Sequence, residues 1–280
     1  MADKQIYRFP NEINEIEITS LGARVTVMPH DAADIYVEYD NPKSTPEFCA
    51  VLSNKTLSLK EMLSFSIFGN KPADNYTLNV YLPAVSYGKI KINTTNGGVS
   101  VDRVSAETFE LSNASGEINV NAAFDNVKLT SASGSVTLAN PTESVARTLK
   151  TRVVSGTAVI NGYRAEEYSL HSVSGSMFYN GAVGAGDISV TSGTVEVSYA
   201  EWNGDLAISA ISGSVNVSVP SDTGLDVSFK GMSGILKTDV GNPKGSFMNL
   251  GIGTAGEFGG ENKHKLNASL TSGIVTIAQQ

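Results

Sequence analysis

The sequence has little of what most metal sites and many catalytic sites are built from. It contains one cysteine, Cys49, which excludes an internal disulfide and a cysteine-rich metal site. Its three histidines, His30, His171 and His264, have no partners at metal-ligand spacing. We therefore expect no metal and no other cofactor, and we expect Cys49 to be a packing residue.

Basic charge and long apolar runs are also scarce. The chain has 20 Lys and Arg against 28 Asp and Glu, a net charge of −8, so we expect no nucleic-acid partner. No stretch approaches the roughly 18 apolar residues of a membrane span, and Met1–Pro10 lacks the apolar core of a signal peptide. As written, the sequence predicts a cytoplasmic protein without direct membrane insertion. The alternative is association with the cell envelope through a partner.

What the sequence does have is one short pattern, repeated many times. In Leu129–Leu138, LTSASGSVTL, two alternating runs meet at a Ser-Gly corner, and 27 glycines point to many such corners. With Asn96-Gly97 aligned to Ser-Gly, the corners recur 18 to 22 residues apart as far as Gly234, and one more follows near the end. The corner glycines are Gly97, Gly116, Gly134, Gly156, Gly175, Gly193, Gly213, Gly234 and Gly273.

Within each copy, apolar residues stand five positions before the corner glycine and two and four positions after it. Successive side chains of a strand point to opposite faces, so these residues share one face and predict a core. The predicted core residues are Leu111, Ile118, Val120, Leu129, Val136, Leu138, Leu170, Met177, Tyr179, Ile188, Val195, Val197, Ile208, Val215 and Val217.

A copy of about 19 residues cannot bury such a face alone, whereas stacked copies make a continuous core. The sequence therefore predicts an all-β, parallel β-helix-like solenoid with repeats of about 19 to 20 residues. Alternatively, Ser-Gly could be a hairpin turn, and the copies would then form antiparallel, propeller-like blades. Repeat length varies while the corner stays constant, which favours the solenoid because loops at one edge of a stack vary easily.

Stacking also explains why the corner residues recur. It predicts a ladder of glycines that tolerate positive φ, beside a ladder of serines whose hydroxyls bond turn backbone. These serines are Ser115, Ser133, Ser155, Ser174, Ser192, Ser212 and Ser233.

We divide the chain into an irregular β cap, residues 1–88, that continues into the solenoid repeats of residues 89–280. Ile16–Val27 is interpreted as a first, degenerate copy of the repeat. The apolar segment Met62–Gly69 is interpreted as a cover for the end of the stack, the alternative being an exposed binding loop. A glycine-rich insertion, residues 242–262, interrupts the last copies.

The tandem pattern, together with Tyr81-Leu-Pro-Ala84 and Lys89–Val99, resembles the bacterial "putative adhesin" domain family of unknown function. The resemblance extends from about Ile13 to Ala278. It implies an all-β, β-helix-like solenoid of right-handed coil. It implies no catalytic residues, because none is assigned to the family.

One stripe of side chains is a candidate binding surface. Two residues before several corners, on the face opposite the predicted core, stand apolar residues, and Phe178 faces the same way. Exposed contiguous apolar strips are uncommon on monomers, so we expect the stripe to be covered by the insertion or by a second chain, which leaves a homo-oligomer open. The alternative is a local reorientation that buries it. The stripe comprises Val154, Val173, Phe178, Ile211 and Met232.

Four aromatic residues, Tyr163, Tyr168, Tyr199 and Trp202, cluster in the loops of successive copies. Aromatic rings at an edge can form a platform for sugars, but tyrosine in such places more often packs. Both interpretations are kept at this point.

Acidic residues offer no convergent pair. Glu117 and Glu196 are predicted to face outward four corners apart, roughly 19 Å at one strand spacing per copy, too far for a glycosidase pair. Glu166-Glu167 is expected in a loop and Asp187 ahead of a strand. Residues 251–256 match the start of a dinucleotide fingerprint, but they lack its βαβ context and are expected to be a loop.

The sequence therefore favours a non-enzymatic interaction or scaffold protein that binds a protein or a glycan through solenoid faces or edge loops. The alternative is a polysaccharide-active lyase or hydrolase built on a β-helix. Converging ionisable groups on one concave surface would favour the enzyme, and a smooth Ser/Thr surface would favour binding.

Overall fold

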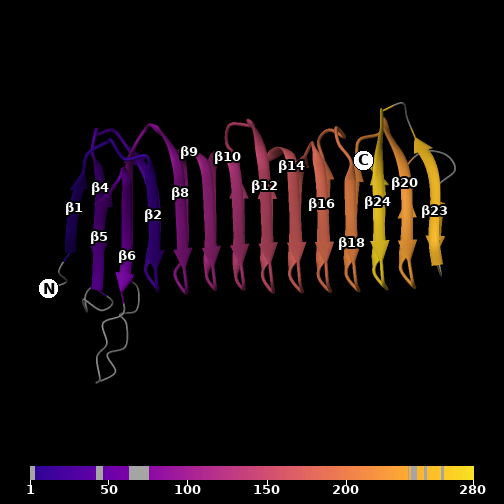
Figure 1. Ribbon diagram of the computed structural model, residues 1–280, viewed down its shortest axis with the longest axis horizontal. Helices are drawn as coiled ribbons and strands as arrows, with labels where there is room; N and C mark the ends of the chain where they lie inside the picture. Colours follow the sequence, from indigo (N-terminus) through magenta and orange to yellow (C-terminus); the bar gives the residue numbers. More distant parts are fainter. Residues whose placement is uncertain are drawn as a thin grey trace, which may run out of the picture. The chain divides into compact units, whose positions relative to one another are not determined.

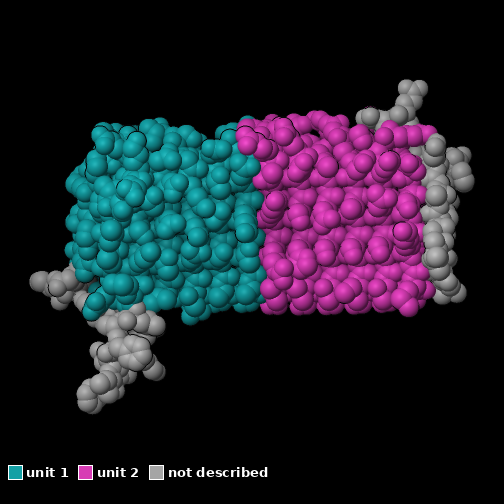
Figure 2. Space-filling model, viewed as in Figure 1, with its two compact units in different colours: residues 1–142 teal, residues 143–280 magenta. Residues whose placement is uncertain are grey.

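The structure is a computed structural model that describes residues 4–41, 47–62, 76–238, 240, 245–248, 251–259 and 262–280. The chain forms two compact units, residues 1–142 (unit 1) and 143–280 (unit 2), coloured separately in Figure 2. Every regular element of the described chain is a β-strand (Figure 1), which confirms the all-β prediction.

The strands of unit 1 are β1 (Lys4–Phe9), β2 (Glu15–Ser20), β3 (Arg24–His30), β4 (Ile35–Asp40), β5 (Glu47–Ser53), β6 (Thr56–Met62), β7 (Thr77–Pro83), β8 (Ser86–Thr94), β9 (Val99–Asn113), β10 (Glu117–Ser131) and β11 (Ser135–Ala139).

The strands of unit 2 are β12 (Val145–Val153), β13 (Thr157–Asn161), β14 (Arg164–Ser172), β15 (Ser176–Ala182), β16 (Ala185–Val190), β17 (Thr194–Tyr199), β18 (Leu206–Ala210), β19 (Ser214–Val219), β20 (Thr223–Gly231), β21 (Ile235–Thr238), β22 (Gly245–Met248), β23 (Gly251–Gly259), β24 (Asn262–Leu270) and β25 (Ile274–Gln279).

Each copy of the repeat contributes one strand before the corner and one strand after it. We call the sheet made by the strands before the corners the incoming sheet, and the sheet made by those after the corners the outgoing sheet. In unit 2, β14 pairs in parallel with β16 in the incoming sheet, and β15 pairs in parallel with β17 in the outgoing sheet. Parallel pairing between copies confirms the β-helix-like solenoid and contradicts the antiparallel alternative. The hand of the coil stays a prediction.

The core lies between the two sheets, where the alternation placed it. Leu170 and Ile188 of the incoming sheet and Val195 and Val215 of the outgoing sheet are fully buried. The other predicted core residues are buried as well. The period-two pattern therefore identified the inward face of both sheets correctly.

The copies are not stacked in chain order at the ends. In unit 1, β2 lies between β6 and β8, and β3 lies between β7 and β9. The first copy of the repeat, β2 and β3, therefore lies between two copies that follow it in the chain. In unit 2, β24 lies between β18 and β20 (Figure 1), and β25 lies between β19 and β21. The repeat pattern predicted that the copies stack in the order of the chain. The strand pairings correct this prediction in both units.

Antiparallel strands end each stack. In unit 1, β5 pairs antiparallel with β6, β4 with β7, and β1 with β4. In unit 2, β22 pairs antiparallel with β21, and β23 with β20. The predicted insertion at residues 242–262 thus continues the two sheets with its described strands. Of the apolar segment Met62–Gly69, residues 63–69 lie outside the described residues.

The corner glycines are required by the close approach of neighbouring copies. A Cβ atom on Gly193 would lie 2.1 Å from the carbonyl oxygen of Gly175, and one on Gly134 would lie 2.2 Å from that of Gly116. Positive φ, the reason expected from the sequence, applies at Gly116 (+130°) and Gly134 (+117°). In unit 2 the reason is close contact, with backbone at Gly175, Gly193 and Gly273 and with the side chains of Val190 at Gly213 and Leu270 at Gly234.

The corner serines form the expected ladder, and its bonds run between copies. Ser174 Oγ donates to the carbonyl of Val154 at 3.1 Å, and Ser192 Oγ donates to that of Val173 at 3.2 Å. Ser133, Ser212, Ser233 and Ser272 repeat the arrangement. The hydroxyl therefore links each corner to the neighbouring corner, a bond within the stack.

The unit boundary falls at residues 142 and 143, and β8 crosses the position 88/89 at which the sequence was divided.

Candidate functional site

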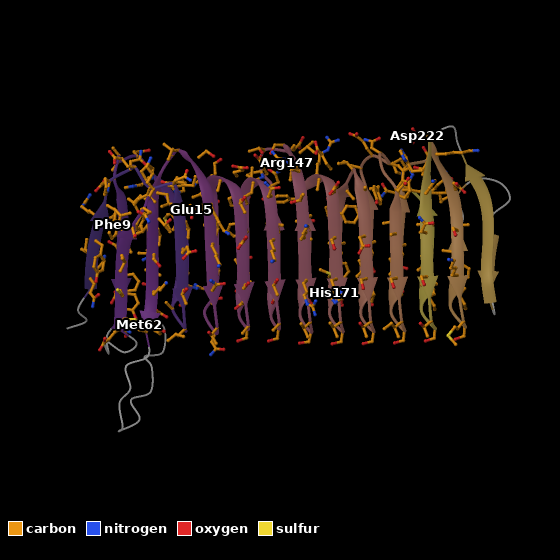
Figure 3. The ribbon with its side chains drawn as sticks, in the orientation of Figure 1. Phe9, Glu15, Met62, Arg147, His171 and Asp222 are labelled. Carbon is orange, nitrogen blue, oxygen red and sulfur yellow. The ribbon has the colours of Figure 1, made fainter. Side chains whose placement is uncertain are left out.

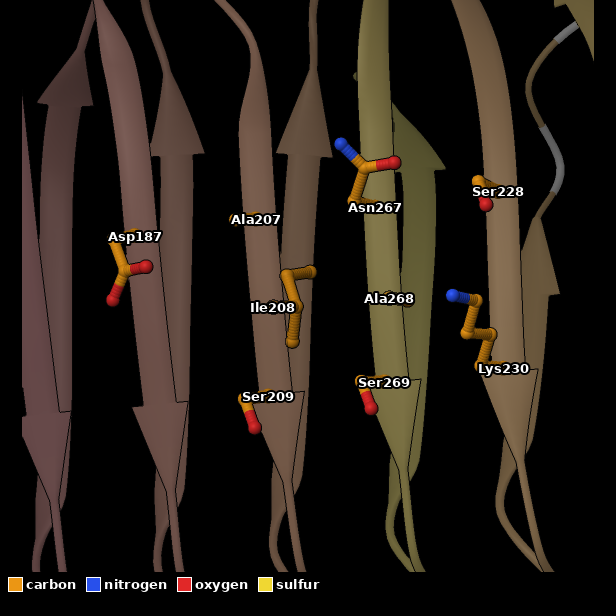
Figure 4. A pocket seen from close by; sticks show the side chains of 9 residues that line it. All are labelled: Asp187, Ala207, Ile208, Ser209, Ser228, Lys230, Asn267, Ala268 and Ser269. Carbon is orange, nitrogen blue, oxygen red and sulfur yellow. The ribbon is translucent and has the colours of Figure 1, made fainter.

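A hollow of about 410 Å³ lies on the outer face of the incoming sheet of unit 2, over β16, β18, β24 and β20. Figure 4 shows its floor at Ala207 and Ser209, with Asp187 on one side and Lys230 on the other. Asn267, Ser269 and Ser228 complete its polar lining. The floor is low because short side chains stand there between strands whose outward side chains are longer.

Strand register arranges the outward side chains of this sheet into rows that cross the strands. On the face of unit 2 visible in Figure 2, side chains stand in such regular rows. We call the row nearest the corners, four residues before each corner glycine, the serine row. It runs, one residue per strand, through Arg152, His171, Ser189, Ser209, Ser269 and Lys230.

A second row, six residues before each corner glycine, contains a wider range of side-chain types. It runs, one residue per strand, through Lys150, Ser169, Asp187, Ala207, Asn267 and Ser228. Asp187 is the one carboxylate among the residues that line the hollow. The hollow therefore combines hydroxyls, an amide, one carboxylate and one ammonium group.

The polar groups of the serine row have no bonding partners within the described part of the chain. Among the residues that the structure describes, Arg152 and Lys230 form no ion pair, and the hydroxyls of Ser189, Ser209 and Ser269 make no hydrogen bond. Ser209, Ser269 and Lys230 are exposed. Donors and acceptors that satisfy no internal need remain free to bind a ligand.

The insertion of β24 assembles this surface. Ser209 stands next to Ser269, and Ala207 next to Asn267, only because β24 pairs with β18 on one side and with β20 on the other. These residues are about sixty positions apart in the chain. Reading the copies in order would instead have placed Lys230 directly beside Ser209, and sequence reasoning missed the hollow for that reason.

The corresponding face of unit 1 carries a different arrangement of charge. Its outward residues in successive strands, Glu17, Lys91, Glu110 and Lys128, alternate in sign. Lys89 Nζ also pairs with Glu110 at 2.9 Å. The equivalents of the serine row in this unit run through Lys60, Thr19, Asn93, Ser112 and Thr130, so the cation among these five stands at one end.

The four aromatic residues proposed as an edge are brought together, but inside the unit. Tyr163, Tyr168, Tyr199 and Trp202 are all buried. Tyr168 and Tyr199 share a hydrogen bond between their hydroxyls, and the Tyr199 and Trp202 ring centroids lie 4.6 Å apart. No ring face is presented to a sugar, so the packing interpretation holds.

Burial has electrostatic and steric consequences in this cluster. It raises the pKa of Tyr168 well above the ordinary value, and the neighbouring Tyr199 adds to that rise. Burial likewise raises the pKa values of Tyr179 and Tyr199. A Cβ atom at Gly186 would lie 2.3 Å from the Tyr168 ring, so this glycine makes room for the cluster.

The predicted apolar stripe is neither continuous nor confined to one face. Val154, Val173, Ile211 and Met232 stand at corners, whereas Phe178 lies on β15 in the outgoing sheet. Phe178 faces away from the core, as its parity predicted, and is 38% exposed, but the chain turns at the corner and places it on the outer face of the other sheet.

The last copy, β24 and β25, lies between two earlier copies and interrupts the stripe. Thr271 stands between Ile211 and Met232, because the corner of β24 and β25 bonds to both neighbouring corners. Ile211 is 53% exposed and Met232 is 72% exposed. The strands β22 and β23 of the glycine-rich insertion, residues 242–262, extend the sheets beside β21 and β20. They therefore do not provide the cover that was expected over the stripe.

The remaining candidates stay apart. Glu117 and Glu196 belong to different units. Glu166 and Glu167 lie in β14, and residues 251–256 lie in β23, so both predicted loops are strands. The described residues contain no group of three His, Cys, Asp or Glu side chains that could hold a metal ion.

The histidines have ordinary surroundings. His30 Nε2 lies 2.6 Å from the carbonyl oxygen of Asp34, and His264 Nδ1 lies 3.8 Å from Asp205 Oδ1. His171 stands toward the corner end of β14 (Figure 3), where it belongs to the serine row. The serine row thus includes a histidine for which the sequence suggested no role.

Comparison with protein families gives one match. A family model described as Toastrack DUF4097 matches residues 13–278, nearly the whole chain. No curated protein matches the sequence. Among the described residues there is no helix able to cross a bilayer.

Two solved structures share the fold. A "putative lipid binding protein" from Parabacteroides distasonis aligns with a TM-score of 0.60 at 12% identity, over 99% of this chain and 96% of the other. A "putative adhesin" from the same organism aligns with a TM-score of 0.51 at 12% identity, over 99% of this chain and 97% of the other. At this identity the likeness concerns the fold alone.

Proposed function

The chain belongs to the Toastrack DUF4097 family, and we propose that it is a non-enzymatic binding protein that holds a glycan on the outer face of the incoming sheet of unit 2. The hollow over β16, β18, β24 and β20 is the centre of that surface. Association with the cell envelope through a partner belongs to the same proposal.

The composition of the hollow carries the proposal. Ser209, Ser228 and Ser269 supply hydroxyls, Asn267 supplies an amide, and Asp187 and Lys230 stand at opposite sides. Hydroxyl and amide groups can both donate and accept hydrogen bonds, which suits a ligand made of hydroxyls. The parallel strands hold these groups at a repeated spacing on a rigid sheet.

Similar structures support a binding role as a class. The structure with a TM-score of 0.60 is named a "putative lipid binding protein", and the one with a TM-score of 0.51 is named a "putative adhesin". Neither name describes catalysis. The glycan is chosen over a lipid because six of the nine residues that line this hollow have polar side chains, the other three being Ala207, Ile208 and Ala268.

The alternative, an enzyme acting on polysaccharide, is distinguished by its carboxylates. A glycosidase uses a pair of them, about 5 to 10 Å apart, on either side of the bond that it cleaves. Asp187 is the one carboxylate that lines the hollow. An Asp187→Asn variant is therefore expected to keep glycan binding, and the wild-type protein is expected to leave bound polysaccharides uncut.

A hollow-filling variant tests the proposal. Ser209→Leu with Ser269→Leu places two large side chains on the floor at outward positions, so it should abolish binding without unfolding the protein. The full chain would be screened on a glycan array, and crosslinked pull-downs from the source cell would be run alongside. Ser112→Leu, at the equivalent row of unit 1, is the matched control and should bind like the wild type.

Loss of binding in Ser209→Leu with Ser269→Leu, but not in Ser112→Leu, supports the proposal. Equal binding by the double variant and the wild type overturns it, as does a capture by protein partners that the hollow-filling variant leaves unchanged. Circular dichroism of both variants verifies that the sheets are intact.

A further inference from the structure

We infer that the ligand is an acidic polysaccharide, a polymer that carries carboxylates on its sugars, and that it lies across the strands of unit 2 along the serine row from Arg152 to Lys230. This inference rests on the proposed function and specifies the chemistry of its ligand.

Charge is the first argument. The chain has a net charge of −8, yet the serine row contains Arg152, His171 and Lys230 and no acidic residue. Arg152 and Lys230 are exposed and make no ion pair with described residues. A cationic row in an acidic protein is a specific feature, because guanidinium and ammonium groups are the natural partners of carboxylates.

The length of the row is the second argument. Arg152 and Lys230 stand on β12 and β20, with β14, β16, β18 and β24 between them. Five strand spacings of about 4.8 Å separate their backbones by about 24 Å. One small anion cannot contact both ends, whereas an extended polymer can, with the hydroxyls of Ser189, Ser209 and Ser269 below its middle.

The surroundings of the row decide between kinds of polymer. Asp187 lies in the neighbouring row, and Glu167 and Asp226 lie further along their strands on the same face. These carboxylates repel a double-stranded nucleic acid, which carries one charge per about 1.7 Å of its axis, more than a polysaccharide with one carboxylate per sugar. The aromatic rings of unit 2 that could stack on bases, Tyr168, Tyr199 and Trp202, are buried.

The experiment compares one polymer with and without its charge. Binding of the full-length protein to polygalacturonate, alginate and hyaluronan would be measured by calorimetry at low and at high salt. Fully methyl-esterified polygalacturonate is the uncharged control, because it keeps the backbone and loses the carboxylates. We expect at least tenfold tighter binding of the acidic form, weakened by salt.

Variants locate the contact. Arg152→Gln with Lys230→Gln should lower affinity for the acidic polymer at least tenfold and bring it to the level of the ester. Lys91→Gln with Lys128→Gln removes two positive charges from the equivalent sheet of unit 1 and should leave the affinity unchanged. Both changes are on exposed or half-exposed outward side chains, so folding is preserved.

The outcomes separate this inference from the proposed function. Equal affinity for the acid and the ester overturns the inference, and so does an equal loss of affinity in the two charge-removing double variants. If Ser209→Leu with Ser269→Leu still abolishes binding in that case, the ligand is a neutral glycan and the proposed function stands. Binding of anionic lipid vesicles in place of all three acidic polymers also overturns it. If no polysaccharide binds and the hollow-filling variant has no effect, the proposed function fails as well.

Discussion

Units 1 and 2 are built from the same repeat but present different outer faces. In unit 1 the outward residues Glu17, Lys91, Glu110 and Lys128 alternate in charge from strand to strand. In unit 2 the same sheet carries short polar side chains between charges that have no partner among the described residues. The inward residues form a similar aliphatic core in both. Folding therefore constrains one face of each strand, and binding can evolve on the other.

The two units also differ inside. Corner glycines of unit 1 include Gly116 and Gly134, which have positive φ, whereas Gly175, Gly193, Gly213, Gly234 and Gly273 in unit 2 are constrained by contact alone. The tyrosines of unit 2 share a hydrogen bond between Tyr168 and Tyr199, whereas Tyr87 in unit 1 has a buried hydroxyl with no hydrogen-bond partner among the described residues. Each difference can be tested by paired substitutions.

Glycine corners should give the largest effect. Gly134→Ala is expected to cost about 2–5 kcal/mol, because it adds both a clash with the Gly116 carbonyl and the strain of positive φ. Gly193→Ala adds the clash alone and should cost about 1–3 kcal/mol. Urea denaturation of both variants measures the difference. Equal costs would show that backbone conformation plays no part at Gly134.

Removal of buried tyrosine hydroxyls should give the next largest effect on the free energy of unfolding. Tyr168→Phe leaves the Tyr199 hydroxyl buried without its partner and should cost about 1–3 kcal/mol at neutral pH. Tyr87→Phe removes a hydroxyl that lacks a partner and should be neutral or slightly stabilising. A larger cost for Tyr87→Phe than for Tyr168→Phe would contradict this assignment.

The same variants predict a pH dependence. Burial raises the pKa of Tyr168 above its ordinary value, so below pH 10 the hydroxyl is protonated in both the folded and the unfolded state and its titration does not change stability. Above about pH 10 the unfolded state loses the proton first, and the free energy of unfolding falls as pH rises. Tyr168→Phe should make this fall shallower by about 1.4 kcal/mol per pH unit. Denaturation midpoints across alkaline pH measure the slope.

Exposed corner residues should give the smallest effect. Ile211→Asp with Met232→Asp changes exposed side chains of unit 2, and we expect the free energy of unfolding to stay within about 0.5 kcal/mol. Sedimentation of the variant and the wild type tests the proposal that a second copy covers the corners. A lower mass for the variant supports such a homo-oligomer, and an unchanged mass contradicts it.

Much of the fold could be predicted from the repeat. The alternation around each corner identified Leu170, Ile188, Val195 and the other inward residues, all of which are buried. Tandem copies of one short unit predicted parallel stacking. The reason is physical: a pattern of period two has one apolar face, and a short copy can bury that face only against its neighbours.

The candidate site was less predictable. Sequence reasoning proposed Phe178 and the aromatic residues, yet Phe178 lies in the other sheet and Tyr163, Tyr168, Tyr199 and Trp202 are buried. It passed over Ser209, Ser269 and Lys230, because serine and lysine at outward positions look the same whether or not they adjoin a hollow.

By itself, the sequence determined the all-β class, the corners, the parallel stack and the inward faces, since each of these depends on residues close together in the chain. Only the tertiary structure decided which copies are neighbours. Because β24 is inserted between β18 and β20, residues about sixty positions apart form one surface. Pairing between strands depends on backbone hydrogen bonds that any copy can offer, so the pattern shared by all copies could not specify their order.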